Sequence, residues 1–412
     1  MKTRIVMDNV FIKVQDNMIG PLSEKKLRTL IEQGVFTPND CVWSNRARDW
    51  IRAESMPGMA SFFNLQGEQV APSARLLAIA SGKGGVGKTV ITASMGVALA
   101  SLGYNVIIVD SDFGGANLHT VMGLLQPEYS FDDFFTQRGR PLSEFLVETP
   151  IANLRMISGS CGALDLVSPQ YHKKQRFIRA LKSLRADFII MDLGGGSNFN
   201  VLDFFLLADE PILVVNPELP SVQEAFGFIK VCLMRSLKRT FKDQPSALAV
   251  LNEQERNQSE MELTVEQILA KLATEGLETT LKSESAVGSF KPKLILNKAR
   301  EKSDLDEAIS IRVAASDLLS LQVGILGRIS LDDNVARAVR HFRPFILHDP
   351  KSRAAQDLMN LIHTKILCRK GLRELLKKRR WRKQVAAITE VYPEVKLVDE
   401  VPVIEIVKAK SV

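Results

Sequence analysis

The sequence predicts an α/β protein whose main part is a doubly wound, mostly parallel sheet with helices on both faces. Between residues 75 and 367, short and continuous apolar runs alternate with helical patterns, which is typical of strands buried on both faces. A glycine-rich turn joins the first apolar run to the first helical pattern. The strands are expected at Leu76–Ala80, Val106–Val109, Phe188–Met191, Ile212–Val215, Leu294–Leu296 and Val323–Ile329, with helices that include Val90–Leu102 and Ser221–Leu237.

The remaining segments predict three additions to this main domain. Residues 1–60 are expected to form a small α+β domain, and the polar residues 61–74 a linker. Within the main domain, about residues 240–291 turn polar and are expected to be an insertion of one or two helices. Residues 368–412 are expected to form a basic amphipathic helix and a tail. A chain of 412 residues is long enough for two or three such domains.

The first 60 residues predict four short elements. Val10–Val14 is expected to be a strand, Asn17–Pro21 a turn and Glu24–Gln33 a helix, and two short strands follow. Trp43 and Trp50 lie in those last two strands. Two tryptophans in so small a unit indicate either its core or a peptide-binding face, and the sequence leaves both interpretations open.

Cysteine usage and hydropathy exclude several classes of protein. The four cysteines are far apart and no Cys-x-x-Cys occurs, so a zinc ribbon and a disulfide framework are excluded and a reducing compartment is expected. The amino terminus has no signal-peptide core, and no run of about 18 apolar residues exists. We therefore expect a cytoplasmic protein, either free or peripheral on the inner face of the cell membrane.

The net charge of +7 originates in one segment, because residues 365–383 contain ten Lys or Arg and one Glu. Residues 361–388 are expected to form a helix that carries this charge, with Trp381 suited to a membrane interface. An anionic membrane, nucleic-acid phosphates and a purely structural or protein-binding role are the alternatives. The chain after this helix, which includes Tyr392, is expected to be weakly ordered.

The glycine-rich turn predicts a phosphate-binding loop. Residues 81–89 read Ser-Gly-Lys-Gly-Gly-Val-Gly-Lys-Thr, which fits the pattern Gly-x-x-x-x-Gly-Lys-Ser/Thr. Glycines let the backbone curl so that N–H groups point at phosphate oxygens, and the following helix adds its positive amino terminus. Lys88 is expected to contact the β- and γ-phosphates, and Thr89 to ligate Mg²⁺. The backbone of the predicted site is formed by Gly82, Lys83, Gly84, Gly85, Val86, Gly87 and Val90.

Two of the predicted strands end in acidic residues. Asp110 and Asp112 follow Val106–Val109, and Asp192 follows Phe188–Met191. The carboxyl ends of parallel strands face the ligand crevice, so these carboxylates are expected beside the phosphates. Asp192 and Asp110 are candidates for holding Mg²⁺ through its water shell. Acids that merely terminate turns are the alternative.

With its second lysine, Lys83, the loop resembles the deviant Walker A motif of the MinD/ParA family of ATPases. The resemblance covers roughly residues 75–367 and is strongest to FlhG/FleN-like and MinD-like members. It implies that Lys83 crosses a dimer interface to the nucleotide of the partner subunit, that Asp112 prepares the attacking water, and that Asn297 contacts adenine. Residues 1–60 are similar to GYF-type domains, which bind proline-rich peptides.

The resemblance implies an ATP-dependent dimerisation switch that binds ATP and Mg²⁺ and hydrolyses ATP to ADP. Such a switch would act as a spatial regulator of the flagellar, cell-pole or division-site type. Its expected partners are a second copy, a proline-rich protein through residues 1–60 and an anionic membrane through residues 365–383, with DNA less favoured. A ParA-like DNA-binding partition ATPase and a nucleotide-locked scaffold with little hydrolysis are the alternatives.

Overall fold

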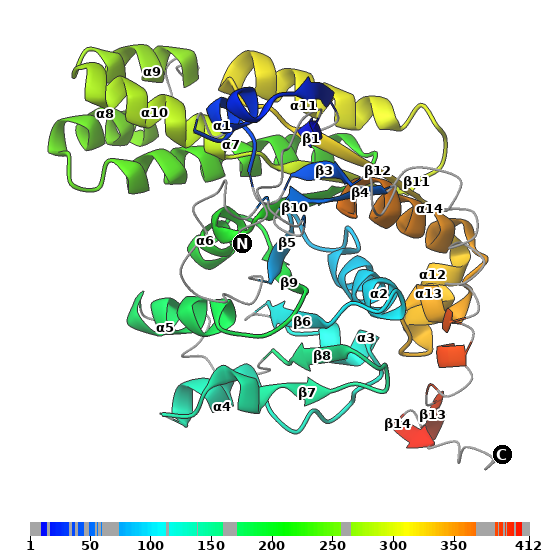
Figure 1. Cartoon of the computed structure of the whole chain (residues 1–412). Helices are drawn as coiled ribbons and strands as arrows, with labels where there is room; N and C mark the ends of the chain where they lie inside the picture. Colours follow the sequence, from blue (N-terminus) through cyan, green and yellow to red (C-terminus); the bar gives the residue numbers. More distant parts are fainter. Residues whose placement is uncertain are drawn as a thin grey trace, which may run out of the picture. The chain divides into compact units, whose positions relative to one another are not determined.

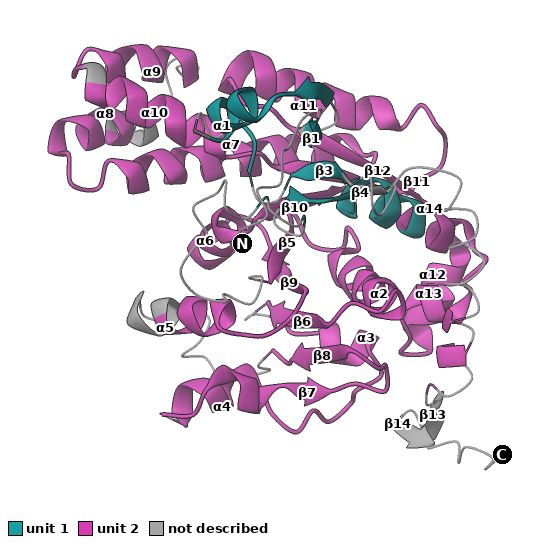
Figure 2. Ribbon diagram, in the orientation of Figure 1, with its two compact units in different colours: residues 1–73, 359–383 teal, residues 74–358, 384–412 magenta. Residues whose placement is uncertain are grey.

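The computed structural model (Figure 1) describes most of the chain as two compact units, which Figure 2 distinguishes by colour. One unit comprises residues 1–73 and 359–383, and the other comprises residues 74–358 and 384–412. The domain boundaries expected from the sequence stay predictions. The described residues are 10–14, 17–32, 35–37, 40–44, 49–53, 56, 59, 74–112, 115–137, 139–159, 171–256, 265–367, 384–385, 387–389, 392, 394–398 and 401–405.

The described part of residues 1–60 forms a four-stranded antiparallel sheet in the order β2-β1-β3-β4 and one α-helix. The prediction of a turn over Asn17–Pro21 is wrong, because these residues lie in β2 and pair with β1, with Ile19 opposite Ile12. The pairing register of β1 and β2 shifts between Val10 and Ile12, opposite Gly20 and Pro21 of β2. The elements are β1 (Val10–Val14), β2 (Asn17–Leu22), α1 (Glu24–Glu32), β3 (Cys41–Ser44) and β4 (Asp49–Arg52).

The core packed against this sheet is apolar, and neither tryptophan is buried in it. Trp43 and Trp50 are half-buried and lie opposite each other on β3 and β4, with ring centroids 5.7 Å apart in an edge-to-face arrangement. Cross-strand aromatic pairs of this kind stabilise a sheet. The buried residues of this apolar cluster are Val10, Ile12, Leu22, Leu27, Phe36, Val42, Ala53 and Met59.

The larger unit is built on an eight-stranded sheet in the order β12-β11-β10-β5-β9-β6-β8-β7. Every neighbouring pair is parallel except β7 and β8, which confirms the predicted mostly parallel sheet. All six predicted strands are present, and β7 and β8 extend the sheet at one edge. The strands are β5 (Arg75–Ser81), β6 (Val106–Ser111), β7 (Val147–Glu148), β8 (Leu154–Ile157), β9 (Phe188–Gly195), β10 (Glu210–Val215), β11 (Lys293–Ala299) and β12 (Gly324–Ser330).

Helices cover both faces of this sheet, with α2 (Lys88–Ser101) on one face and α6 (Phe199–Leu207) on the other (Figure 1). Strands β5, β6 and β10 are buried along their whole length, which explains their continuous apolar sequences. The short elements between the strands are α3 (Leu118–Val121), α4 (Phe131–Thr136), the 3₁₀ helix η3 (Leu142–Phe145), α5 (Tyr171–Lys182), α12 (Asp333–Arg340) and α13 (Phe345–His348).

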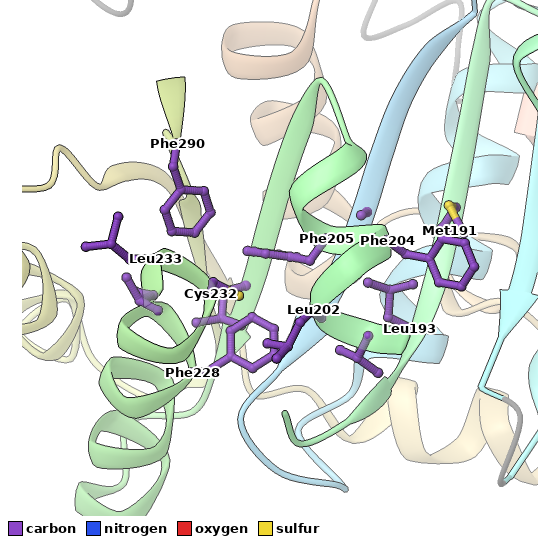
Figure 3. Packing of buried hydrophobic residues seen from close by; sticks show 14 of the residues in the cluster. Met191, Leu193, Leu202, Phe204, Phe205, Phe228, Cys232, Leu233 and Phe290 are labelled. Atoms are coloured by element: carbon purple, nitrogen blue, oxygen red, sulfur yellow. The ribbon is translucent and has the colours of Figure 1, made fainter. Parts of the chain in front are cut away.

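The described residues of the insertion form three helices, where one or two were predicted: α8 (Pro245–Arg256), α9 (Val265–Ala273) and α10 (Leu277–Ser289). They pack beside α7 (Leu219–Thr240) and α11 (Leu305–Leu319), and their apolar residues join the core of the domain. Figure 3 shows part of this core, where Phe205 of α6 meets Phe228 of α7 edge to face at 5.0 Å. The ring centroid of Phe290, which follows α10, lies 6.2 Å from that of Phe205, so the core of the insertion is continuous with the main core.

A carboxyl-terminal segment, called the strap below, has described residues 384–385, 387–389 and 392, which belong to the larger unit. Its side chains Val385 and Tyr392 are buried, so the prediction of a weakly ordered chain around Tyr392 is wrong. The Tyr392 hydroxyl donates a hydrogen bond to the carbonyl of Met122, and its ring lies beside Gly123. Arg343 donates from Nη2 to the carbonyl oxygens of Thr389 at 2.9 Å and Tyr392 at 3.2 Å.

The helix α14 (Arg353–Leu361) continues as a π-helical turn, Ile362–Ile366, before the basic segment. Most of the helix predicted over residues 361–388 lies outside the described residues. Beyond the strap, β13 (Glu394–Val398) and β14 (Val401–Glu405) form an antiparallel pair. Among the described helices, none combines the length and the apolar character needed to cross a bilayer.

Candidate functional site

The glycine-rich loop connects β5, which ends at Ser81, to α2, which begins at Lys88. Gly87 precedes the helix with a φ of 101°, a left-handed conformation that glycine adopts without steric cost. Gly82 is needed for a different reason, since a Cβ there would lie 2.6 Å from the backbone of Glu224 in α7. Glycines at these two positions let the loop curl tightly at the carboxyl end of the sheet.

Two side chains at the start of α2 lie beside an acid of β9. Lys88 is buried, and its positive charge lowers the pKa of Asp192. Thr89 donates a side-chain hydrogen bond that also lowers this pKa, and Thr92 donates to Asp192 at 3.4 Å. The structure therefore brings Lys88, Thr89 and Asp192 together, as the sequence predicts.

Asp192 and Asp110 face each other across neighbouring strands, as register partners of β9 and β6. Both are buried, and burial raises the pKa of each carboxyl above its ordinary value. The charge of Asp110 raises the pKa of Asp192 further. The backbone N–H groups of Leu118 at 3.0 Å and of Asp112 at 3.2 Å donate to the Asp110 carboxylate. These hydrogen bonds lower the pKa of Asp110 and partly offset the effect of burial.

Two buried carboxyls that disfavour each other's charge fit a divalent cation, which would stabilise both in the ionised form. Among the described residues there is no group of three or more His, Cys, Asp or Glu that could hold a metal. Mg²⁺ commonly takes only one or two carboxylates and completes its octahedron with water and substrate phosphates. Thr89, Asp192 and Asp110 therefore fit such an ion.

Asp112 lies at the end of β6 and is half-buried. It lies against the glycine-rich end of β9, where a Cβ on Gly194 would be 3.1 Å from Oδ1 of Asp112. Gly196, directly after this strand, donates from its backbone N–H to the carbonyl of Ser81 at 3.1 Å, so the end of β9 contacts the start of the phosphate loop. The predicted catalytic acid is thus part of the same strand-end cluster as the loop.

Lys83 is more accessible than Lys88 and pairs with an acid that the sequence reasoning missed. Its Nζ lies 3.5 Å from Oε2 of Glu218, the residue that precedes α7. The side chain of Lys83 is 28% exposed and that of Glu218 is 61% exposed. No signal in the sequence connects these two positions, since only the fold brings the loop and α7 together.

The predicted adenine contact, Asn297, lies at the end of β11, buried against the loop. Its Nδ2 donates to the carbonyl of Val86 at 2.7 Å. The adjacent Lys298, to which the sequence reasoning gave no role, donates from Nζ to the carbonyl of Gly85 at 2.9 Å. The adenine contact stays a prediction, as do the roles of the other site residues.

Residues 77–345 match the profile of the CobQ/CobB/MinD/ParA nucleotide binding domain, which covers more than half of the chain. The chain belongs to this family. Its sheet and helices are those of the MinD-like P-loop NTPase fold, as the sequence predicts. Residues 11–59 match GYF domain 2, which agrees with the predicted similarity of the first unit.

Several curated proteins are similar to this member of the MinD/ParA family. A putative septum site-determining protein MinD of Tupiella akineta is 30% identical over 37% of this chain and 50% of its own length. The antiactivator FleN of Pseudomonas aeruginosa is 32% identical over 38% of this chain and 56% of its own length. The chain thus spans about half the length of these two curated relatives.

Longer matches are more distant. The septum site-determining protein MinD of Bacillus subtilis is 27% identical over 69% of this chain and 86% of its own length. Among solved structures, MinD of Pyrococcus horikoshii complexed with Mg-ADP is 23% identical, with a TM-score of 0.47, over 70% of this chain and 95% of that one.

Proposed function

We propose that the protein is an ATPase that acts as an ATP-dependent dimerisation switch and as a spatial regulator of the flagellar, cell-pole or division-site type. One observation carries this proposal: a single phosphate loop has two lysines in different environments. Lys88 is buried beside Asp192, where a bound phosphate would be enclosed. Lys83 reaches outward to an exposed acid, where a second subunit could meet it.

The buried part of the site would bind the nucleotide. N–H groups of the loop and the Lys88 ammonium would bind the phosphate oxygens. Thr89 would ligate Mg²⁺ directly, and Asp192 and Asp110 would hold it through water; the ion would neutralise phosphate charge. The raised pKa of both buried carboxyls supports this assignment, because a bound cation would stabilise their ionised forms.

Asp112 would prepare the water for hydrolysis. Its carboxylate lies against Gly194 at the end of β9 and within the strand-end cluster, so it can accept a hydrogen bond from a water beside a terminal phosphate. That water would attack the γ-phosphorus, the bond to the ADP oxygen would break, and ADP and phosphate would be released.

Lys83 would connect nucleotide binding to dimerisation. Its ion pair with Glu218 is solvent-accessible, and such pairs contribute only about 0–1 kcal/mol. Exchanging Glu218 for the triphosphate of a second subunit therefore costs little. Hydrolysis removes the terminal phosphate and with it much of the charge that holds Lys83 across the interface.

Asp112→Ala is expected to reduce ATP turnover by about 100-fold or more, the usual contribution of a positioned acid or base. The variant is expected to remain a dimer in Mg-ATP, whereas the unmodified protein returns to monomers as ATP is consumed. Light scattering coupled to size-exclusion chromatography, with a phosphate-release assay, measures both. Asp317→Ala, which removes an exposed acid of α11, is the control. Normal turnover by Asp112→Ala would remove this residue from the mechanism.

We further propose that the basic segment holds the dimer at an anionic membrane. Residues 368–383 contain nine Lys or Arg and one Glu, and they also include Trp381. Each basic residue near an anionic bilayer contributes about 1 kcal/mol. The same charge makes a ParA-like DNA-binding ATPase the second candidate.

Replacing three arginines of this segment with glutamine is expected to weaken binding to phosphatidylserine-containing vesicles by about 100-fold. Flotation with anionic and neutral vesicles measures this, and fluorescence anisotropy with duplex DNA tests the rival function. Substitution is preferred to truncation because truncation also removes Tyr392. The DNA-binding function would be favoured if the unmodified protein bound DNA but not vesicles and the variant lost the binding to DNA. The replaced residues are Arg379, Arg380 and Arg382, and the control set is Lys242, Lys271 and Arg300, all exposed.

A further inference from the structure

Two consecutive residues at the end of β11 bind two consecutive carbonyls of the phosphate loop. Asn297 donates to Val86 at 2.7 Å and Lys298 donates to Gly85 at 2.9 Å, across more than 200 residues of sequence. Successive side chains of a regular strand point to opposite faces of the sheet. Here both reach one loop, because Lys298 has a φ of 57° and the register with β12 shifts between Leu296 and Ala299.

The conformation of Lys298 is uncommon for a residue that is not glycine, asparagine or aspartate. Left-handed residues of this kind persist only where the surrounding structure stabilises them, and they concentrate at functional sites. The two hydrogen bonds to the loop are such a stabilising contact. This observation indicates that the end of β11 is shaped to hold the loop.

The orientation of a carbonyl determines the orientation of the N–H group that shares its peptide plane. In a trans peptide the two point in opposite directions. The Gly85 carbonyl shares its plane with the Val86 N–H, and the Val86 carbonyl shares its plane with the Gly87 N–H. Holding both carbonyls on the side of β11 therefore directs both N–H groups to the opposite side of the loop.

Without such contacts these two peptide planes would rotate easily. Gly85, with a φ of 76°, and Gly87 flank the segment, and glycine has the widest range of backbone conformations. Asn297 also restricts Gly87 by packing, since a Cβ on Gly87 would lie 2.4 Å from its Nδ2. The loop thus obtains from β11 the rigidity that its own sequence lacks.

We propose that Asn297 and Lys298 are positioning residues for phosphate binding, which they promote by fixing the peptide groups that present the Val86 and Gly87 N–H donors. This inference rests on the proposed nucleotide binding. It gives Asn297 a role that does not involve the adenine base, and Lys298 a role that does not require contact with the ligand.

The test compares binding of ATP with binding of inorganic tripolyphosphate, which has no base, by calorimetry in the presence of Mg²⁺. Lys298→Met removes the donor and keeps the length of the side chain. This variant is expected to lower the affinity for both ligands to the same extent, by about 3- to 10-fold, since one hydrogen bond is lost. Lys298→Arg retains a donor and is expected to restore most of the affinity. Asn297→Ala is expected to weaken tripolyphosphate as well as ATP.

Controls separate positioning from charge and from stability. Lys302→Met removes an exposed lysine four residues further on and is expected to bind both ligands normally. The melting temperature of unliganded Lys298→Met is expected to match that of the unmodified protein. The inference would be overturned if Lys298→Met and Asn297→Ala bound tripolyphosphate with unchanged affinity, or if Lys302→Met lost as much affinity as Lys298→Met. Either result would leave the proposed function standing. An unmodified protein that binds neither ligand would overturn the proposed function and this inference together.

Discussion

Lys88→Ala is expected to abolish nucleotide binding, with a loss of at least about 100-fold in affinity for both ATP and ADP. Hydrogen bonds to charged groups contribute about 1.5–3 kcal/mol each, and Lys88 is the lysine at the amino terminus of α2. Its charge also lowers the pKa of Asp192, so its removal is expected to raise that pKa and to weaken the Mg²⁺ site as well. Calorimetry with each nucleotide measures the loss.

The control for this variant is Lys291→Ala, which removes a lysine on the surface of the same domain. Circular dichroism of the unliganded Lys88→Ala variant is expected to be unchanged, since a protonated Asp192 needs no nearby cation. ATP binding of normal strength in the folded Lys88→Ala variant would refute the assignment of the phosphate loop.

The second large effect is expected from Lys83→Ala, which should bind ATP with nearly normal affinity and fail to dimerise. The buried part of the site keeps Lys88, Thr89 and Asp192, so binding by one subunit is retained. The interface loses the ammonium group proposed to meet the phosphates of the other subunit. Light scattering in Mg-ATP, performed in the Asp112→Ala background to prevent hydrolysis, measures the mass of the particle directly.

Glu218→Gln is the informative companion variant. It removes the carboxylate that pairs with Lys83 at 3.5 Å and leaves Lys83 available, so its ATP dimer is expected to form at equal or lower protein concentration. A Lys83→Ala variant that dimerises like its parent would contradict the proposed switch and leave only a nucleotide-binding protein.

The central sheet is predictable because its chemistry is local. A parallel strand covered on both faces must be apolar along its length, and β5, β6 and β10 are buried throughout. Strand β8 (Leu154–Ile157) escapes this reasoning because it is short and Arg155 interrupts its apolar run. The sequence predicts one or two helices in the insertion instead of three, because only a few residues of each helix reach the core.

The candidate site also has a part that local motifs predict and a part that depends on the fold. The loop and the strand-end acids follow from short motifs, since each motif contains the residues that its chemistry needs. The contacts of Lys83 with Glu218 and of Lys298 with Gly85 depend on tertiary packing. The sequence shows that Asn297 and Lys298 lie at the end of a predicted strand. It does not show that Lys298 donates to the carbonyl of Gly85, which lies 213 residues away in the chain.

The burial of Tyr392 anchors the chain on the carboxyl-terminal side of residues 368–383. Val385 and Tyr392 are buried in the larger unit, and the Thr389 hydroxyl donates to the carbonyl of Leu347. A single proteolytic cut between residues 368 and 383 would therefore break the chain covalently, while these contacts would keep the carboxyl-terminal fragment attached to the larger unit.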